Sequence, residues 1–158
     1  MTDSALEHLA LLGLDYETVE YGRVASAEEA AAARGIELRQ LIKTLVVRRG
    51  EDDYVFVMVT GDSQIDWKKL RGALGVRRMT MPGPDEAREA TGYARGTITP
   101  LGSVQPWPVL ADVRVAASAL ISLGSGRHGR AIHLDASALL TALGAQTADI
   151  AETAGPAE

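Results

Sequence analysis

The sequence predicts a mixed α/β fold, an α+β arrangement in a single compact domain over residues 1–158 with its core in about residues 4–150. Three observations support this prediction. The length suits one domain, strand-like and helix-like segments follow one another irregularly, and two apolar runs flank a charged turn as in an antiparallel hairpin. We therefore expect a curved, mixed or largely antiparallel sheet with surrounding helices.

The first forty residues predict two helices and one strand. Leucines recur three residues apart in residues 4–12, which favours a helix. Residues 16–21 alternate between apolar and polar side chains, as a strand does. Ser26 followed three residues later by Glu29 forms a capping box, so a second helix begins there and ends before Gly35.

The centre of the chain predicts a buried hairpin. After a short helical turn over residues 37–41, residues 42–48 form one apolar run and residues 54–60 another, with charged residues between them. Nearly continuous apolar strands are typical of the centre of a sheet.

The second half predicts three helices and four strands. Asp66, Pro84 with the acids that follow it, and Asp135 are helix-starting residues. The expected helices are 67–74, 84–91 and 135–143, and the expected strands are 76–81, one near 106–110, 119–123 and 131–134. Residues 155–158 are expected to fray.

Composition narrows the possible chemistry. The sequence contains no cysteine, which excludes disulfides, thiolate zinc sites and a cysteine nucleophile. Its three histidines lack the spacing of a metal site, so we expect neither a metal nor a cofactor. The polar N-terminus and the lack of a long apolar run predict no signal peptide, no membrane span and a cytoplasmic protein.

The net charge of −5 argues against broad nonspecific binding to nucleic acid, which depends on lysine and arginine. It does not exclude a local basic surface. Two clusters of basic residues could contact a phosphate backbone, or they could be ordinary charges exposed to solvent. The candidates are Lys68, Lys69, Arg77 and Arg78 in one group and Arg127 and Arg130, beside His128, in another.

Lys43 is the most informative single residue. It stands at the start of the apolar, β-branched run 42–48, and a lysine there must reach water or find a partner. It could hold a carbonyl or phosphate oxygen, or act as a base if burial lowers its pKa. The alternative is an edge-strand lysine that reaches solvent. Thr44 points to the opposite face of an ideal strand.

A loop rich in glycine, threonine and proline, residues 91–102, offers main-chain N–H groups that could cradle an anion or an oxyanion. It matches neither a Walker loop nor a dinucleotide fingerprint, and it could be a plain surface loop. The glycine turn 124–129 could face phosphate or simply close a hairpin. Ser125 has no evident His/Asp partners for a hydrolase triad.

These pieces, in this order, resemble the YbaK/EbsC-like aminoacyl-tRNA deacylases, the editing domains associated with prolyl-tRNA synthetase. The resemblance rests on Leu-Ile-Lys-Thr-Leu-Val at 41–46, Thr-Gly-Tyr-Ala-Arg-Gly-Thr-Ile-Thr-Pro-Leu-Gly at 91–102, the turn 124–129 and the closing helix. It spans about residues 4–150. It implies a compact mixed α/β fold and cleavage of the ester between a wrong amino acid and the terminal adenosine of tRNA.

The resemblance also implies roles for individual residues. Lys43, Gly96 and Thr97 are the expected catalytic residues, with the main chain of 96–100 flanking the ester. The expected substrate-binding residues are Tyr21, Thr44, Tyr93, Ile98, Pro100, Gly124, Ser125, Gly126 and His128. Those expected to contact tRNA are Lys68, Lys69, Arg77, Arg78, Arg127 and Arg130.

The mechanism expected from these residues needs no side-chain nucleophile. Loop amides and the Lys43 ammonium would stabilise charge on the carbonyl oxygen, while water or the substrate's own hydroxyl or thiol attacks. Ala131 stands where some relatives carry an acid. That difference leaves alanyl-, cysteinyl- or another mischarged tRNA open, including a tRNA for proline.

The acidic net charge also bears on which partners the protein needs. A synthetase such as prolyl-tRNA synthetase, or an elongation factor, is expected to help recruit mischarged tRNA, because the acidic chain should bind RNA weakly. The first alternative is a non-catalytic module that binds tRNA ends or a nucleotide and regulates a synthetase. The second is a ligand-binding domain with no RNA partner. The oligomeric state is left open.

Overall fold

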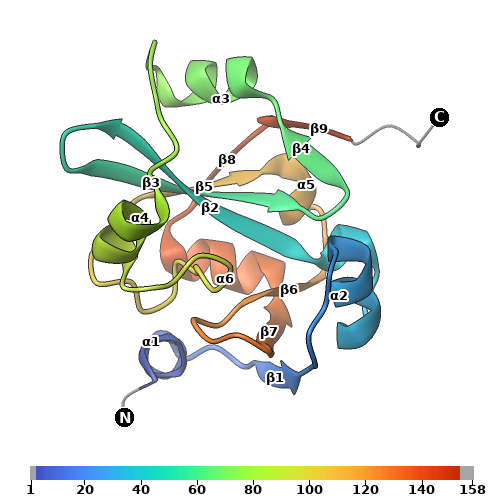
Figure 1. The fold of residues 1–158 in the computed structure, drawn as a ribbon. Coiled ribbons are helices and arrows are strands. Elements are labelled where there is room, and N and C mark those ends of the chain that lie inside the picture. The colour runs from blue at the N-terminus through green and yellow to red at the C-terminus, as the bar shows by residue number, and fades with distance from the viewer. Residues whose placement is uncertain (1–2, 154–158) are drawn as a thin grey trace.

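The computed structural model describes residues 3–153, so the tail expected to fray lies outside the described residues. A four-stranded sheet crosses the molecule in the order β2 (Ile42–Gly50), β3 (Asp53–Thr60), β5 (Val109–Asp112) and β8 (Gln146–Ala148) (Figure 1). β2 and β3 are antiparallel, whereas β3, β5 and β8 are parallel neighbours. The sheet is therefore mixed, and its hairpin is the one that the sequence predicts.

Two smaller sheets are antiparallel. One has the order β1 (Glu17–Glu20), β7 (Arg130–Asp135) and β6 (Leu120–Gly124), and the other pairs β4 (Ser63–Ile65) with β9 (Ala151–Thr153). The helices are α1 (Ser4–Leu12), α2 (Ala27–Arg34), α3 (Trp67–Leu74), α4 (Pro84–Thr91), α5 (Val113–Ala116) and α6 (Ala136–Leu143), with a 3₁₀ turn η1 (Leu38–Gln40). The mixed α/β fold class is confirmed.

Both faces of the four-stranded sheet are buried, which explains why β2 and β3 are almost continuously apolar. On one face, Val47, Val55 and Val57 pack with Leu70 of α3 and with β9. On the other, the larger core gathers β2 and β3 with α1, α4, α6 and the β1-β7-β6 sheet. Figure 1 shows α3 and the β4–β9 pair on one side of the sheet and α6 with β6 and β7 on the other.

Side-chain caps begin α2 and α3 where the sequence predicts them. The Ser26 hydroxyl accepts a hydrogen bond from the Glu29 amide at 3.1 Å. The Asp66 carboxylate accepts from the amides of Lys68 and Lys69, each at 3.1 Å. Each such cap satisfies N–H groups that the first helical turn leaves without partners.

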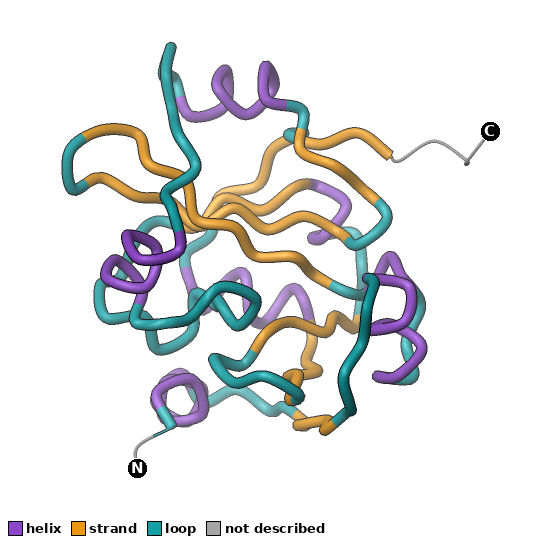
Figure 2. Tube along the Cα trace, in the orientation of Figure 1, coloured by secondary structure: helices purple, strands orange, loops and turns teal. Residues whose placement is uncertain are grey.

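One predicted strand is wrong. Residues 76–81 form a loop between α3 and α4, as Figure 2 shows, and only Thr80 pairs, in a single bridge with Arg48. The sequence reading also misses α5 and the three short strands β4, β8 and β9, whose pairing depends on distant partners. No helix in residues 3–153 is long and apolar enough to cross a membrane.

Candidate active site

A cavity of about 610 Å³ lies along the outer edge of β2. That volume is in the range of small-molecule sites in proteins. Its walls come from β2, the start of α4 with the segment before it, the glycine-rich loop, the end of α2 and the start of the glycine turn. The lining residues are Arg34, residues 41–46, residues 81–84, Ala87, Arg95, Gly96, Ile98 and Gly124.

Lys43 lies half-buried at the wall of this cavity. Its Nζ donates a hydrogen bond to the Ser63 carbonyl at 2.7 Å. Burial lowers the pKa of Lys43, and the nearby carboxylates of Asp62 and Glu28 oppose part of that shift. An ammonium has three N–H donors, so Ser63 uses one of them.

Thr44 occupies the opposite face of β2 from Lys43, as strand alternation requires. Its neighbour Val46 packs in the larger core, while Val47 packs in the core under α3. The Thr44 hydroxyl is buried and has no hydrogen-bond partner within residues 3–153. A buried hydroxyl without a partner is costly, so this oxygen is a candidate contact for a ligand.

The glycine-rich loop reaches the cavity through Gly96, Ile98 and Arg95. The Thr97 side chain does not line it: its hydroxyl donates to the Ala94 carbonyl at 2.7 Å, and its own carbonyl accepts from the Gly126 amide at 3.0 Å. The loop and the glycine turn are in close contact, because a Cβ at Gly124 would lie 3.1 Å from the Ile98 carbonyl oxygen.

Tyr93 and Ser125 hold these two loops from behind. Both are buried. The Tyr93 hydroxyl donates to the Leu101 carbonyl, and its ring lies where a Cβ on Gly126 would be, 2.5 Å from a ring carbon. The Ser125 hydroxyl donates to the Arg130 carbonyl at 2.8 Å. These contacts make both residues supports of the loops in this structure.

Arg34, at the end of α2, is a wall residue that sequence reasoning misses. Its Nη1 donates to the Ser122 hydroxyl at 3.2 Å and its Nη2 to the Tyr21 hydroxyl at 3.1 Å. Tyr21 therefore orients Arg34 and is not itself among the lining residues. An arginine closing an alanine-rich helix carries no sequence signal of such a role.

The structure brings five of the predicted site residues to one cavity: Lys43, Thr44, Gly96, Ile98 and Gly124. The other predicted residues of the two loops are not among its lining residues: Tyr93, Thr97, Pro100, Ser125, Gly126 and His128. Besides Arg34 and Arg95, sequence reasoning misses the wall at residues 81–84. Its Met-Pro-Gly-Pro sequence is the one available signal, since two prolines in four residues fix a rigid turn.

Of the predicted basic residues, some are exposed and others are paired with carboxylates. Lys68, Arg77 and Arg78 are exposed, and the loop that carries Arg77 and Arg78 continues into the cavity wall at residues 81–84. Lys69 pairs with Asp149 at 3.1 Å. Arg130, whose side chain is 11% exposed, pairs with Asp3, so both of these cations already have partners within the fold.

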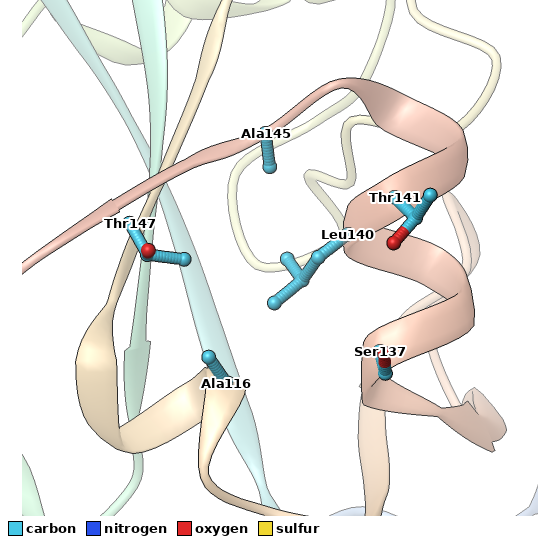
Figure 3. Close-up of a pocket in the computed structure, with 6 residues that line it drawn as sticks. All are labelled: Ala116, Ser137, Leu140, Thr141, Ala145 and Thr147. Atoms are coloured by element: carbon cyan, nitrogen blue, oxygen red, sulfur yellow. The ribbon is translucent and has the colours of Figure 1, made fainter.

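A second, smaller cavity of about 230 Å³ lies between α5, α6 and β8 (Figure 3). Figure 3 shows the side chains of Leu140, Thr141 and Thr147 around it. None of its six lining residues is charged. The cavity at β2, by contrast, is lined by Arg34, Lys43 and Arg95 together with the glycine-rich loop, and we take it as the candidate active site.

Fold and cavity together define a mixed α/β protein with a largely apolar, cation-lined pocket at a sheet edge. Residues 22–142 match the family model described as the aminoacyl-tRNA editing domain, and the chain belongs to this family. The matched range includes Lys43, the glycine-rich loop and the glycine turn.

Individual relatives agree with this assignment. Over 126 residues the chain is 33% identical to EbsC of Enterococcus faecalis, which is named as a candidate Cys-tRNA(Pro)/Cys-tRNA(Cys) deacylase; the match covers 79% of this chain and 76% of EbsC. It is 33% identical over 86 residues to the proline–tRNA ligase of Thermosipho melanesiensis, a match covering 54% of this chain and 15% of the ligase.

A solved structure described as that of a candidate trans-editing enzyme for prolyl-tRNA synthetase shares the fold. It superposes with a TM-score of 0.86 at 29% identity, covering 96% of this chain and 99% of its own. The names of these relatives support a hydrolase role for the family to which this chain belongs.

Proposed function

We propose that this chain deacylates mischarged tRNA in trans, cleaving the ester between the amino acid and the terminal adenosine. The observation that carries the proposal is the cavity at β2, where Lys43, Gly96 and Ile98 line one space. A polarising cation and a loop with main-chain N–H groups are what charge development on an ester carbonyl requires.

The chemical step is hydrolysis. The oxygen of a water molecule bonds to the ester carbonyl carbon, the bond from that carbon to the ribose oxygen breaks, and the ribose oxygen takes a proton. The products are a free amino acid and a tRNA with its terminal hydroxyl restored. Lys43 and the loop amides would stabilise the negative charge that passes through the carbonyl oxygen.

The lining disfavours a cationic amino acid. Leucine, isoleucine, valine, methionine and proline make up half of the lining residues, and none of the lining residues is acidic. A lysyl or arginyl side chain would therefore meet Arg34, Lys43 and Arg95 without a counter-charge. Alanyl, cysteinyl, seryl, threonyl and prolyl esters are the set to test.

The direction of tRNA approach is proposed from exposed charge. Lys68, Arg77 and Arg78 lie on α3 and on the loop leading to the cavity wall, where they could contact phosphates beside the acceptor end. Because the chain is acidic overall, recruitment by prolyl-tRNA synthetase or an elongation factor belongs to the same proposal. Adding either protein should then raise the deacylation rate at low tRNA concentration.

A deacylation panel tests the function. Purified protein is incubated with tRNA charged with each of the five amino acids, and release is compared with spontaneous hydrolysis of the same ester. We expect accelerated release of one or two small amino acids. Release at the spontaneous rate from every charged tRNA, with and without synthetase, would replace the proposal by the non-catalytic binding module.

A further inference from the structure

The cavity lies against a strand edge that is paired only at its two ends. β2 is the outermost strand of its sheet. On its outer side, residues 3–153 supply two isolated bridges, from Leu41 to Ser122 and from Arg48 to Thr80. The cavity residues 42–46 fall between these bridges. An open strand edge carries main-chain N–H and C=O groups without strand partners.

Strand alternation identifies which of these groups face the cavity. Arg48 exchanges main-chain hydrogen bonds with Thr80 at 2.8 and 3.0 Å, so its N–H and C=O point outward. The Leu41 carbonyl accepts from the Gly61 amide on the β3 side, so it points inward. Because the direction repeats every second residue, the N–H and C=O groups of Thr44 and Val46 also point outward, into the cavity.

The charges of the cavity wall create a problem for an aminoacyl ester. Its α-amino group has an ordinary pKa of about 8 and is largely protonated at neutral pH. The lining offers three cations, Arg34, Lys43 and Arg95, and no carboxylate. A buried ammonium needs hydrogen-bond acceptors. The β2 edge offers such acceptors in its outward-facing main-chain carbonyls, and the Thr44 hydroxyl, which has no hydrogen-bond partner within residues 3–153, is another.

We propose that the main-chain carbonyls of Thr44 and Val46, on the open edge of β2, hold the α-ammonium group of the substrate. This inference rests on the proposed function and deepens it. An ammonium donating to a carbonyl makes a charge-assisted hydrogen bond, which is stronger than a neutral one. The site would then recognise the free α-amine of the substrate through main-chain atoms, while the apolar wall accommodates the side chain of the substrate amino acid.

Three esters of one tRNA test this inference. They carry the amino acid that the panel identifies, its α-hydroxy analogue and its desamino analogue, which present an ammonium, a hydroxyl and a C–H at the same position. Each enzymatic rate is divided by the spontaneous hydrolysis rate of the same ester, because the α-ammonium also activates the ester. We expect normalised kcat/KM to fall about tenfold or more from the amino to the desamino ester, with the hydroxy ester between them.

The Thr44→Val variant separates the two kinds of acceptor. It removes the hydroxyl, keeps the shape and leaves the strand edge in place, so the preference for the amino ester should persist whatever the absolute rate. Equal normalised rates for amino and desamino esters would overturn the inference while leaving the deacylase function intact. Loss of the preference in Thr44→Val would also overturn it, in favour of the hydroxyl. Cleavage of none of the three esters would instead remove the proposed function.

Discussion

The candidate site depends on a few side chains whose positions other side chains determine. Arg34 reaches the cavity wall from α2 because Tyr21 and Ser122 accept hydrogen bonds from its two terminal nitrogens. The guanidinium carbon also lies 4.9 Å from the centre of the Tyr21 ring, close enough for a cation–π contact. Tyr21 is therefore a positioning residue in the proposed reaction.

The first prediction concerns the Tyr21 hydroxyl. Tyr21→Phe keeps the ring but removes the acceptor for Arg34, so we expect normalised kcat/KM for deacylation to fall about fivefold, the worth of one hydrogen bond of about 1 kcal/mol. Single-turnover kinetics measures it. Tyr16→Phe, at a tyrosine packed against the core, is the matched control. If the role of the Tyr21 hydroxyl is purely structural, the melting temperature of Tyr21→Phe should instead fall in parallel with the deacylation rate.

At the scale of elements, two loops form the site because they brace each other. The Gly126 amide donates to the Thr97 carbonyl, and Tyr93 from the glycine-rich loop packs under Gly126. Gly126 has φ +85°, a conformation that costs L-residues about 1–2 kcal/mol. The contact leaves no room for a Cβ.

The second prediction uses this contact. Gly126→Ala places a methyl group 2.5 Å from a Tyr93 ring carbon in a strained backbone conformation, so we expect a loss of about 2–3 kcal/mol in unfolding free energy. Gly72→Ala is the control, since nothing lies within 4 Å of its Cβ position inside α3; it should stabilise by about 0.5–1 kcal/mol. Urea denaturation measures both. Equal effects in the two variants would contradict the packing described.

Elements with local sequence signals are the ones that could be predicted. Helices α1, α2, α3, α4 and α6 could be predicted because their caps and apolar periodicity are local. The 42–60 hairpin could be predicted because both runs are apolar and the turn is charged. The strand predicted over residues 76–81 rests on apolar side chains such as Val76. Within the described chain, however, only Thr80 of this segment pairs with β2, in a single bridge to Arg48.

The site was partly predictable for the same reason. Lys43 and the glycine-rich loop are local sequence signals, and both reach the cavity. Arg34 could not be predicted, because its position depends on Tyr21 and on Ser122, 88 residues away. The pairing of Arg130 with Asp3 could not be predicted either, because the two residues lie 127 positions apart in sequence; a tRNA contact of Arg130 stays a prediction.

At the scale of the whole molecule, ion pairs connect Asp3, at the start of the described chain, to Arg127 and Arg130 at the glycine turn. Asp3 accepts from Arg130 Nη2 at 3.1 Å and also caps α1 through the Leu6 amide. The hydrogen bond from Arg130 is the main cause that lowers the pKa of Asp3 below its usual value, with the charges of Arg130 and Arg127 acting in the same direction. The glycine turn is thereby tied to the first helix.

The third prediction is a pH dependence of stability. A carboxylate whose pKa is lowered by folding stabilises the native state above its ordinary pKa of 3.8 and loses that contribution as pH falls through the lower, folded value. Asp3→Asn should therefore cost about 1–3 kcal/mol at pH 7 and progressively less below pH 3.8. Urea titrations at several pH values measure the difference. A cost independent of pH would contradict the ion-pair account.

The fourth prediction concerns the approach of tRNA. Replacing Arg77 and Arg78 by alanine should weaken tRNA binding and reduce the slope of log K against log salt by about 2, one unit for each lost phosphate contact. Arg39 and Arg88, also exposed, are the matched double control and should leave the slope unchanged. Equal slopes for both double variants would place the RNA on another face.

The central claim is that Lys43 and the glycine-rich loop together form a deacylase site. Its most direct test is the first-order deacylation rate of Lys43→Ala on the tRNA that the panel identifies, with Arg39→Ala, at an exposed arginine that does not line the cavity, as control. We expect Lys43→Ala to lose about a hundredfold or more, as when one oxyanion-stabilising donor is removed, with melting temperature retained, and Arg39→Ala to stay within a few-fold of the native rate. Full activity in a folded Lys43→Ala protein would contradict the account.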